Sequence, residues 1–119
     1  MDVLIVENES SIILDLKEYL RNLGHNVVAV TSTGEEAIQK VGDLNPDLVL
    51  INIKLRGEMK GVDAAREIVS LYEIPIIYLS VFYKNCLNKS LQLTEDAIIL
   101  SEPITQEHLE YCISKSVFR

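Results

Sequence analysis

The stretch from Asp47 to Leu55, D-L-V-L-I-N-I-K-L, decides the fold of this chain. Its apolar run, residues 48–53, is broken only by Asn52 and is too short for a comfortable helix. The turn-forming segment 45–47 precedes the run, and Gly57 follows it. A short apolar run between such turn signals is typical of a strand that is buried on both faces, as in the middle of a parallel sheet.

Asn52 stands at the C-terminal end of this strand. In open α/β sheets, ligands bind in the crevice outside the carboxyl ends of the strands. The most interior strand therefore carries one polar side chain to the edge where chemistry usually takes place. That side chain is an amide and not an acid.

The rest of the chain alternates between strand and helix patterns. Further strands are predicted at residues 2–6, 26–31, 74–79 and 97–100. Helices are predicted from the polar segment 7–11 to Leu23 with Gly24 as its stop, from 32–36 to about Gly42, and at 62–72, 81–93 and 105–117. Strict alternation with short connections predicts an α/β fold, a doubly wound five-stranded parallel sheet with helices on both faces. We expect a single domain over residues 1–119.

Composition excludes several classes of protein. The chain has 119 residues, of which 48% are hydrophobic and 24% are charged, and this balance is typical of a globular domain. A net charge of −7 argues against a nucleic-acid-binding surface. No apolar run reaches the length of a membrane span, and the start of the chain does not resemble a signal peptide. Cys86 and Cys112 have no metal-like spacing, so we expect ordinary packing residues in a reduced, cytoplasmic chain.

Polar residues follow the ends of four predicted strands. They are Glu7, Asn8 and Glu9 after the first, Asn52 at the end of the third, Ser80 after the fourth and Glu102 after the fifth. In a doubly wound sheet these side chains converge at one edge. Acids gathered there provide oxygen ligands for a divalent cation, and a hydroxyl with a lysine would suit a phosphoryl group.

Five segments in this order resemble the receiver domain of two-component response regulators, over essentially the whole chain. They are V-L-I-V-E-N-E at 3–9, P-D-L-V-L-I-N-I-K-L at 46–55, G-E-M-K-G-V-D-A-A-R-E-I at 57–68, P-I-I-Y-L-S at 75–80 and L-S-E-P-I at 100–104. The resemblance implies a flavodoxin-like (βα)5 fold with strand order 2-1-3-4-5. Receivers take a phosphoryl group from a histidine kinase onto an aspartate.

The resemblance also assigns a role to individual positions. The phosphoacceptor aspartate falls on Asn52, and the acidic pair, whose second member ligates Mg²⁺, falls on Glu7 and Asn8. The remaining positions are the switch hydroxyl at Ser80, the phosphate-pairing lysine at Glu102, the aromatic switch at Ile99 and a cis peptide before Pro103.

Several of these positions depart from the family pattern in ways that change the chemistry. An amide at position 52 cannot form the acyl phosphate of a carboxylate. Asn8 and Asn52 are neutral where a hard cation prefers carboxylates, so Mg²⁺ is expected to bind weakly. Glu102 would repel a phosphoryl group, and Ile99 has no polar ring to reorient. Only Glu7 and Ser80 keep the family's chemistry.

We therefore predict a pseudo-receiver, not an enzyme, that acts by protein–protein interaction. The resemblance implies a histidine kinase or another signalling protein as partner, and a homodimer surface on the fourth helix, fifth strand and fifth helix. The apolar candidates there are Tyr83, Leu87, Leu91, Leu109, Tyr111 and Ile113.

Three alternatives stay open. The chain is an ordinary phosphoacceptor receiver captured as an Asp-to-Asn variant at position 52, although Asn8 and Glu102 are altered as well. Alternatively, it is a flavodoxin-like domain that binds a phosphate-bearing cofactor, which the acidic, glycine-free loop 7–11 opposes. Finally, Glu102 replaces the lost lysine structurally through a hydrogen bond to Ser80 or Asn52.

Overall fold

The computed structural model describes residues 1–80 and 97–117 of the chain. The elements in order are β1 (Asp2–Val6), α1 (Ser10–Asn22), β2 (Asn26–Thr31), α2 (Gly34–Leu44), β3 (Leu48–Asn52), α3 (Gly61–Tyr72), β4 (Ile76–Ser80), β5 (Ile98–Ser101) and α5 (Gln106–Val117). The five strands pair in parallel in the order β2-β1-β3-β4-β5. The predicted fold class and strand order are confirmed.

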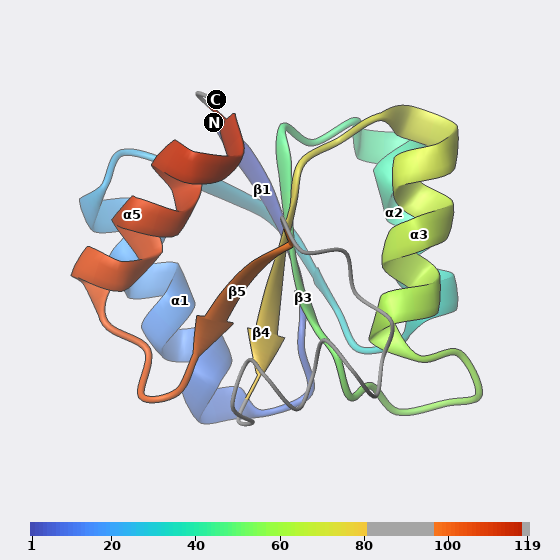
Figure 1. The fold of residues 1–119 in the computed structure, drawn as a ribbon, viewed down its shortest axis with the longest axis horizontal. Helices are drawn as coiled ribbons and strands as arrows, with labels where there is room; N and C mark the ends of the chain where they lie inside the picture. Colours follow the sequence, from blue (N-terminus) through green and yellow to red (C-terminus); the bar gives the residue numbers. More distant parts are fainter. Residues whose placement is uncertain (81–96, 118–119) are drawn as a thin grey trace.

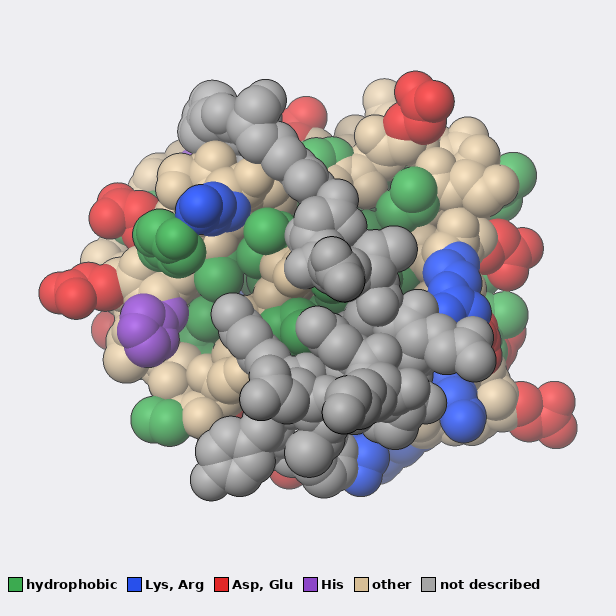
Figure 2. All heavy atoms as spheres, in the orientation of Figure 1, with side chains coloured by type: hydrophobic (Ala, Val, Ile, Leu, Met, Phe, Trp, Pro, Cys, Tyr) green, Lys and Arg blue, Asp and Glu red, His purple; other side chains and the backbone are tan. Residues whose placement is uncertain are grey.

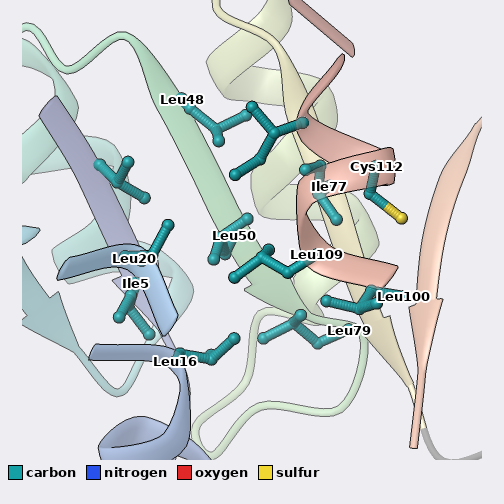
Figure 3. Close-up of a cluster of buried hydrophobic side chains, with 12 residues drawn as sticks. Ile5, Leu16, Leu20, Leu48, Leu50, Ile77, Leu79, Leu100, Leu109 and Cys112 are labelled. Carbon is teal, nitrogen blue, oxygen red and sulfur yellow. The ribbon is translucent and has the colours of Figure 1, made fainter. Parts of the chain in front are cut away.

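The molecule has three layers, with α1 and α5 on one face of the sheet and α2 and α3 on the other (Figure 1). On the first face, Leu16 of α1 and Leu109 of α5 pack against alternate residues of the strands, among them Ile5 and Leu50 (Figure 3). On the second face, the intervening strand residues pack against α2 and α3. Residues 48–51 of β3 are therefore completely buried, as predicted for the central strand.

Helix ends follow local sequence signals. Thr33 caps α2, since its hydroxyl accepts a hydrogen bond from the backbone N–H of Glu36. Gly24 has a φ of 85° just beyond α1, in agreement with its predicted role as a stop. The predicted end of α2 near Gly42 is two residues short, because the helix continues to Leu44 and Asn45 ends it with a φ of 48°.

Two strands begin later than predicted. β4 begins at Ile76 and not at residue 74, because Pro75 has no N–H to donate, although its carbonyl accepts a hydrogen bond from Val49. β5 occupies residues 98–101. The helix predicted at 81–93, with Cys86 and the apolar residues Tyr83, Leu87 and Leu91, lies outside the described residues.

Residues of α5 divide between core and surface. Leu109, Cys112 and Ile113 are buried, so two of the apolar residues predicted for an interaction surface belong to the core. Tyr111 has 61% of its surface exposed. In the part of the chain that the structure describes, no helix is long and apolar enough to cross a membrane. Figure 2 shows acidic side chains at several separate places around the outline of one face.

Candidate functional site

The carboxyl ends of β1, β3 and β4 surround a pocket of about 310 Å³. Glu7, Asn8, Asn52 and Ser80 all line it, so the structure brings together four of the residues that the sequence predicts for a site. Lys54 and Arg56, from the loop between β3 and α3, line it as well.

Glu7 has only 1% of its surface exposed. Its Oε1 accepts hydrogen bonds from the backbone N–H groups of Asn8, at 2.9 Å, and Glu9, at 3.1 Å. The side-chain nitrogen of Asn52 lies 3.0 Å from Oε1 and 2.8 Å from Oε2. A carboxylate with these N–H donors has its charge stabilised although it is out of contact with water.

The orientation of the Asn52 amide follows from its two neighbours. Its Oδ1 accepts a hydrogen bond of 2.8 Å from the backbone N–H of Lys54, a group that can only donate. Nδ2 must therefore face Glu7, which can only accept when ionised. Asn52 thus joins the end of β3 to the end of β1 and also fixes the start of the following loop.

Asn8 connects two loops. Its Nδ2 donates to the carbonyl of Ser32 at 2.7 Å, and its Oδ1 accepts from the backbone N–H of Arg56 at 3.2 Å. The side chain therefore spans the β2–α2 and β3–α3 loops, and both ends of its amide are engaged.

Gly61, the first residue of α3, fits tightly behind Asn52. A Cβ at position 61 would collide with the backbone carbonyl of Asn52, and the N–H of Gly61 donates to the carbonyl of Ile53 at 3.1 Å. Only glycine permits this close approach, so Gly61 fixes the backbone that carries Asn52. This role of Gly61 was not predicted from the sequence, because it depends on how closely two backbone segments approach each other in the fold.

Glu102 is exposed just beyond the end of β5, and it is not among the described residues that line this pocket. Its backbone N–H donates to the carbonyl of Ser80 at 3.0 Å, and the Glu102–Pro103 peptide is cis, the isomer expected there. Partial burial, and then the negative charges of Glu9 and Glu7, raise the pKa of Glu102. The hydrogen bond considered between Glu102 and Asn52 is not among those that the described residues form.

Ile99, on β5, is buried against Ile53 and Val62, with Tyr78 beside it. Tyr78 is the cross-strand partner of Ile99 on β4. Burial raises the pKa of Tyr78, and the charge of Arg66 partly opposes this shift. Among the described residues, the aromatic ring beside Ile99 is thus that of Tyr78 on β4, which was not predicted from the sequence.

The side-chain oxygens of Asn8 and Asn52 and Oε1 of Glu7 accept backbone N–H groups, and the Asn52 amide faces the whole Glu7 carboxylate. Among the described residues, no three histidine, cysteine or acidic side chains gather in a way that could hold a metal ion. Because Mg²⁺ favours several carboxylate and water oxygens around it, this donor set fits the ion poorly.

A parallel sheet of order 2-1-3-4-5, with a polar pocket at its carboxyl edge, defines a domain of the flavodoxin-like fold class. The chain belongs to the response regulator receiver domain family, whose model matches residues 3–113. It is thus a regulatory receiver domain of the two-component type.

Individual relatives agree with this family. The chain is 29% identical over 118 residues to the phyllosphere-induced regulator PhyR of Methylorubrum extorquens, a match that covers 98% of this chain and 43% of PhyR. It is 40% identical over 80 residues to the transcriptional regulatory protein PdtaR of Mycobacterium tuberculosis, covering 67% of this chain and 38% of PdtaR. The chain thus spans less than half the length of these relatives.

Among solved structures, the receiver domain of a modulated diguanylate cyclase from Desulfovibrio desulfuricans G20 superposes with a TM-score of 0.86 at 29% identity. The match covers 98% of this chain and 93% of that one. The match thus extends over most of both chains.

Proposed function

We propose that this chain is a pseudo-receiver, a signalling module that does not accept a phosphoryl group at the usual position and works by binding another protein. The observation that carries the proposal is the direct hydrogen bonding of the Asn52 amide to Glu7. Asn52 then stands at the position of the phosphoacceptor, Glu7 and Asn8 at the acidic pair, Ser80 at the switch hydroxyl and Glu102 at the lysine.

Chemistry at three positions supports this reading. The Asn52 amide is a poor nucleophile, and its oxygen already accepts a hydrogen bond from Lys54. Asn8 is neutral and engaged at both ends. Glu102 carries the same charge as a phosphoryl group, and its pKa is raised first by partial burial and then by the charges of Glu9 and Glu7.

The experiment is an amide NMR titration with beryllofluoride or acetyl phosphate in the presence of Mg²⁺. We expect no saturable shifts at Asn52 or Ser80. A matched positive control restores the three missing groups together, Asn8→Asp, Asn52→Asp and Glu102→Lys, and should respond to the same reagents. Saturable shifts in the unmodified protein would contradict the proposal.

The second candidate is an ordinary receiver that differs at position 52 alone. In that case Asn52→Asp by itself would be labelled rapidly by a small phosphodonor. We expect inefficient labelling, because Asn8 still weakens the cation and Glu102 still opposes the phosphate. Comparison of the single and triple variants by intact mass measures how much the other two positions matter.

The proposed partner is a histidine kinase or another signalling protein in the cytoplasm. We propose that residues 1–119 form a single domain and bind this partner together. We propose self-association as a homodimer through β5, α5 and the segment 81–93, for which only the sequence predicts a helix; exposed Tyr111 is its probe on α5. Sedimentation of the protein and of Tyr111→Ser tests it: a dimer that the substitution weakens supports this surface, and a monomer at high concentration rejects it.

A further inference from the structure

The Glu7–Asn52 pair raises a question that the proposed function leaves open, namely what stabilises a buried carboxylate at a site that fits a cation poorly. Glu7 is 1% exposed, and an unpaired charge at that depth would be costly. Its described hydrogen-bond donors are two backbone N–H groups and the Asn52 side chain. The two backbone donors reach Oε1, so that among the described residues Asn52 is the one donor to Oε2.

We infer that the Asn52 amide takes the structural place of the divalent cation, so that the ends of β1 and β3 are held together without a metal ion. The Nδ2 atom lies 2.8 and 3.0 Å from the two carboxylate oxygens, between them and the end of β3. It thereby presents positive hydrogens to both oxygens of Glu7, where a bound cation would present its charge.

Two neighbouring groups, the backbone N–H of Lys54 and the backbone of Gly61, fix the orientation of the Asn52 amide. The N–H of Lys54 holds Oδ1, which prevents the amide from turning its oxygen toward Glu7. Gly61 lies against the backbone of Asn52 so closely that no side chain fits there. The amide is therefore preorganised for Glu7, and this inference about stability stands whether or not the proposed signalling role is correct.

The direct test is the thermal midpoint of unfolding, measured in EDTA and in excess Mg²⁺. We expect the midpoint of the unmodified protein to be the same in both, within about a degree, because an ion without a site cannot stabilise the folded state. Asn52→Asp replaces the donor with a second carboxylate against a buried one. It should lower the midpoint in EDTA by roughly 10 °C.

Asn26→Asp is the matched control, since it makes the same chemical change at an exposed position on β2. Its midpoint should move by about 2 °C or less. The decisive variant is Glu7→Gln combined with Asn52→Asp, which exchanges amide and carboxylate across the pair. It should recover at least half of the loss that Asn52→Asp causes.

Three outcomes would overturn the inference. The first is a rise of several degrees with Mg²⁺ in the unmodified protein. The second is an Asn52→Asp variant as stable in EDTA as Asn26→Asp. The third is an exchanged pair no more stable than Asn52→Asp. Failure of Asn52→Asp to fold in EDTA supports the inference if the exchanged pair folds and overturns it if the exchanged pair also fails.

Discussion

Two regions at the carboxyl edge of the sheet differ in how their charged side chains are stabilised. On the β1–β3 side, Glu7, Asn8 and Asn52 form a closed set of hydrogen bonds in which each polar group meets a complementary one. On the β4–β5 side, Glu102 is exposed, and its pKa is raised by partial burial and then by the negative charges of Glu9 and Glu7.

We call the set of Glu7, Asn8 and Asn52 the closed side and the region of Glu102 the open side. The departures from the family pattern at Asn8 and Asn52 are matched by hydrogen bonds, whereas the departure at Glu102 is not. On the closed side, the Asn52 amide donates to the single acid Glu7, and the Asn8 amide bonds to the backbone of Ser32 and Arg56. Glu102 instead adds negative charge close to Glu7 and Glu9, where it gains no stabilisation from them. The closed side therefore accounts for the stability of the site, while Glu102 shapes the potential that an approaching ligand or partner meets.

The largest expected loss of stability comes from a substitution at Gly61, whose backbone packs against that of Asn52. Gly61→Ala places a Cβ against the Asn52 carbonyl, which cannot move without pulling on β3. We expect a loss of about 3 kcal/mol in the free energy of unfolding, measured by urea denaturation. Gly42→Ala is the control, because its Cβ meets the hydroxyl end of the exposed Tyr72 side chain, which can move aside, and no backbone atom. Equal losses in both variants would remove the special role of Gly61.

The fold was predictable because each buried strand or helix needs a run or a periodic pattern of apolar residues, and such patterns are visible in the sequence. The apolar run around Leu50 indicated a central strand, and every β-α alternation in the described residues followed from similar runs. Residues converging on the pocket were predictable from strand ends alone. The hydrogen bonds were not, since Asn52 could have faced Glu102 as easily as Glu7 in a linear sequence. The role of Gly61 depends on a separation between backbones that no pattern encodes.

A smaller loss of stability is expected from a substitution at Asn8, which bridges two loops at the edge of the closed side. Asn8→Ala removes the bonds to the Ser32 carbonyl and the Arg56 N–H, and leaves two loops without their bridge. The free energy of unfolding should fall by about 1 to 2 kcal/mol, and hydrogen exchange at Arg56 should accelerate. Asn22→Ala removes a single bond, to Gln106, between exposed side chains and should cost less. Unchanged exchange at Arg56 would show that the loops do not depend on Asn8.

A substitution at Thr31, at the end of β2, tests whether a polar group next to the closed side lacks a hydrogen-bond partner. Its backbone carbonyl accepts the N–H of Glu7, but its buried Oγ1 has no hydrogen-bond partner among the described residues. Thr31→Val keeps the shape and removes the unmet hydroxyl, so stability should rise by about 1 kcal/mol. Thr33→Val should have the opposite sign, because that hydroxyl caps α2. A loss of stability in Thr31→Val would mean that its hydroxyl has a partner.

The smallest effect concerns the open side and depends on pH. Because the pKa of Glu102 is raised in the folded protein, its contribution to stability is greatest below the ordinary carboxyl pKa and is lost as the pH rises through the folded-state value. Glu102→Gln abolishes this dependence. The variant should therefore gain about 0.3 kcal/mol over the unmodified protein as the pH rises from acid to neutral, and added salt should shrink the gain. Glu110→Gln, at an exposed position on α5, controls for the change in net charge; an equal gain there would assign the effect to overall charge and not to the proximity of Glu7 and Glu9.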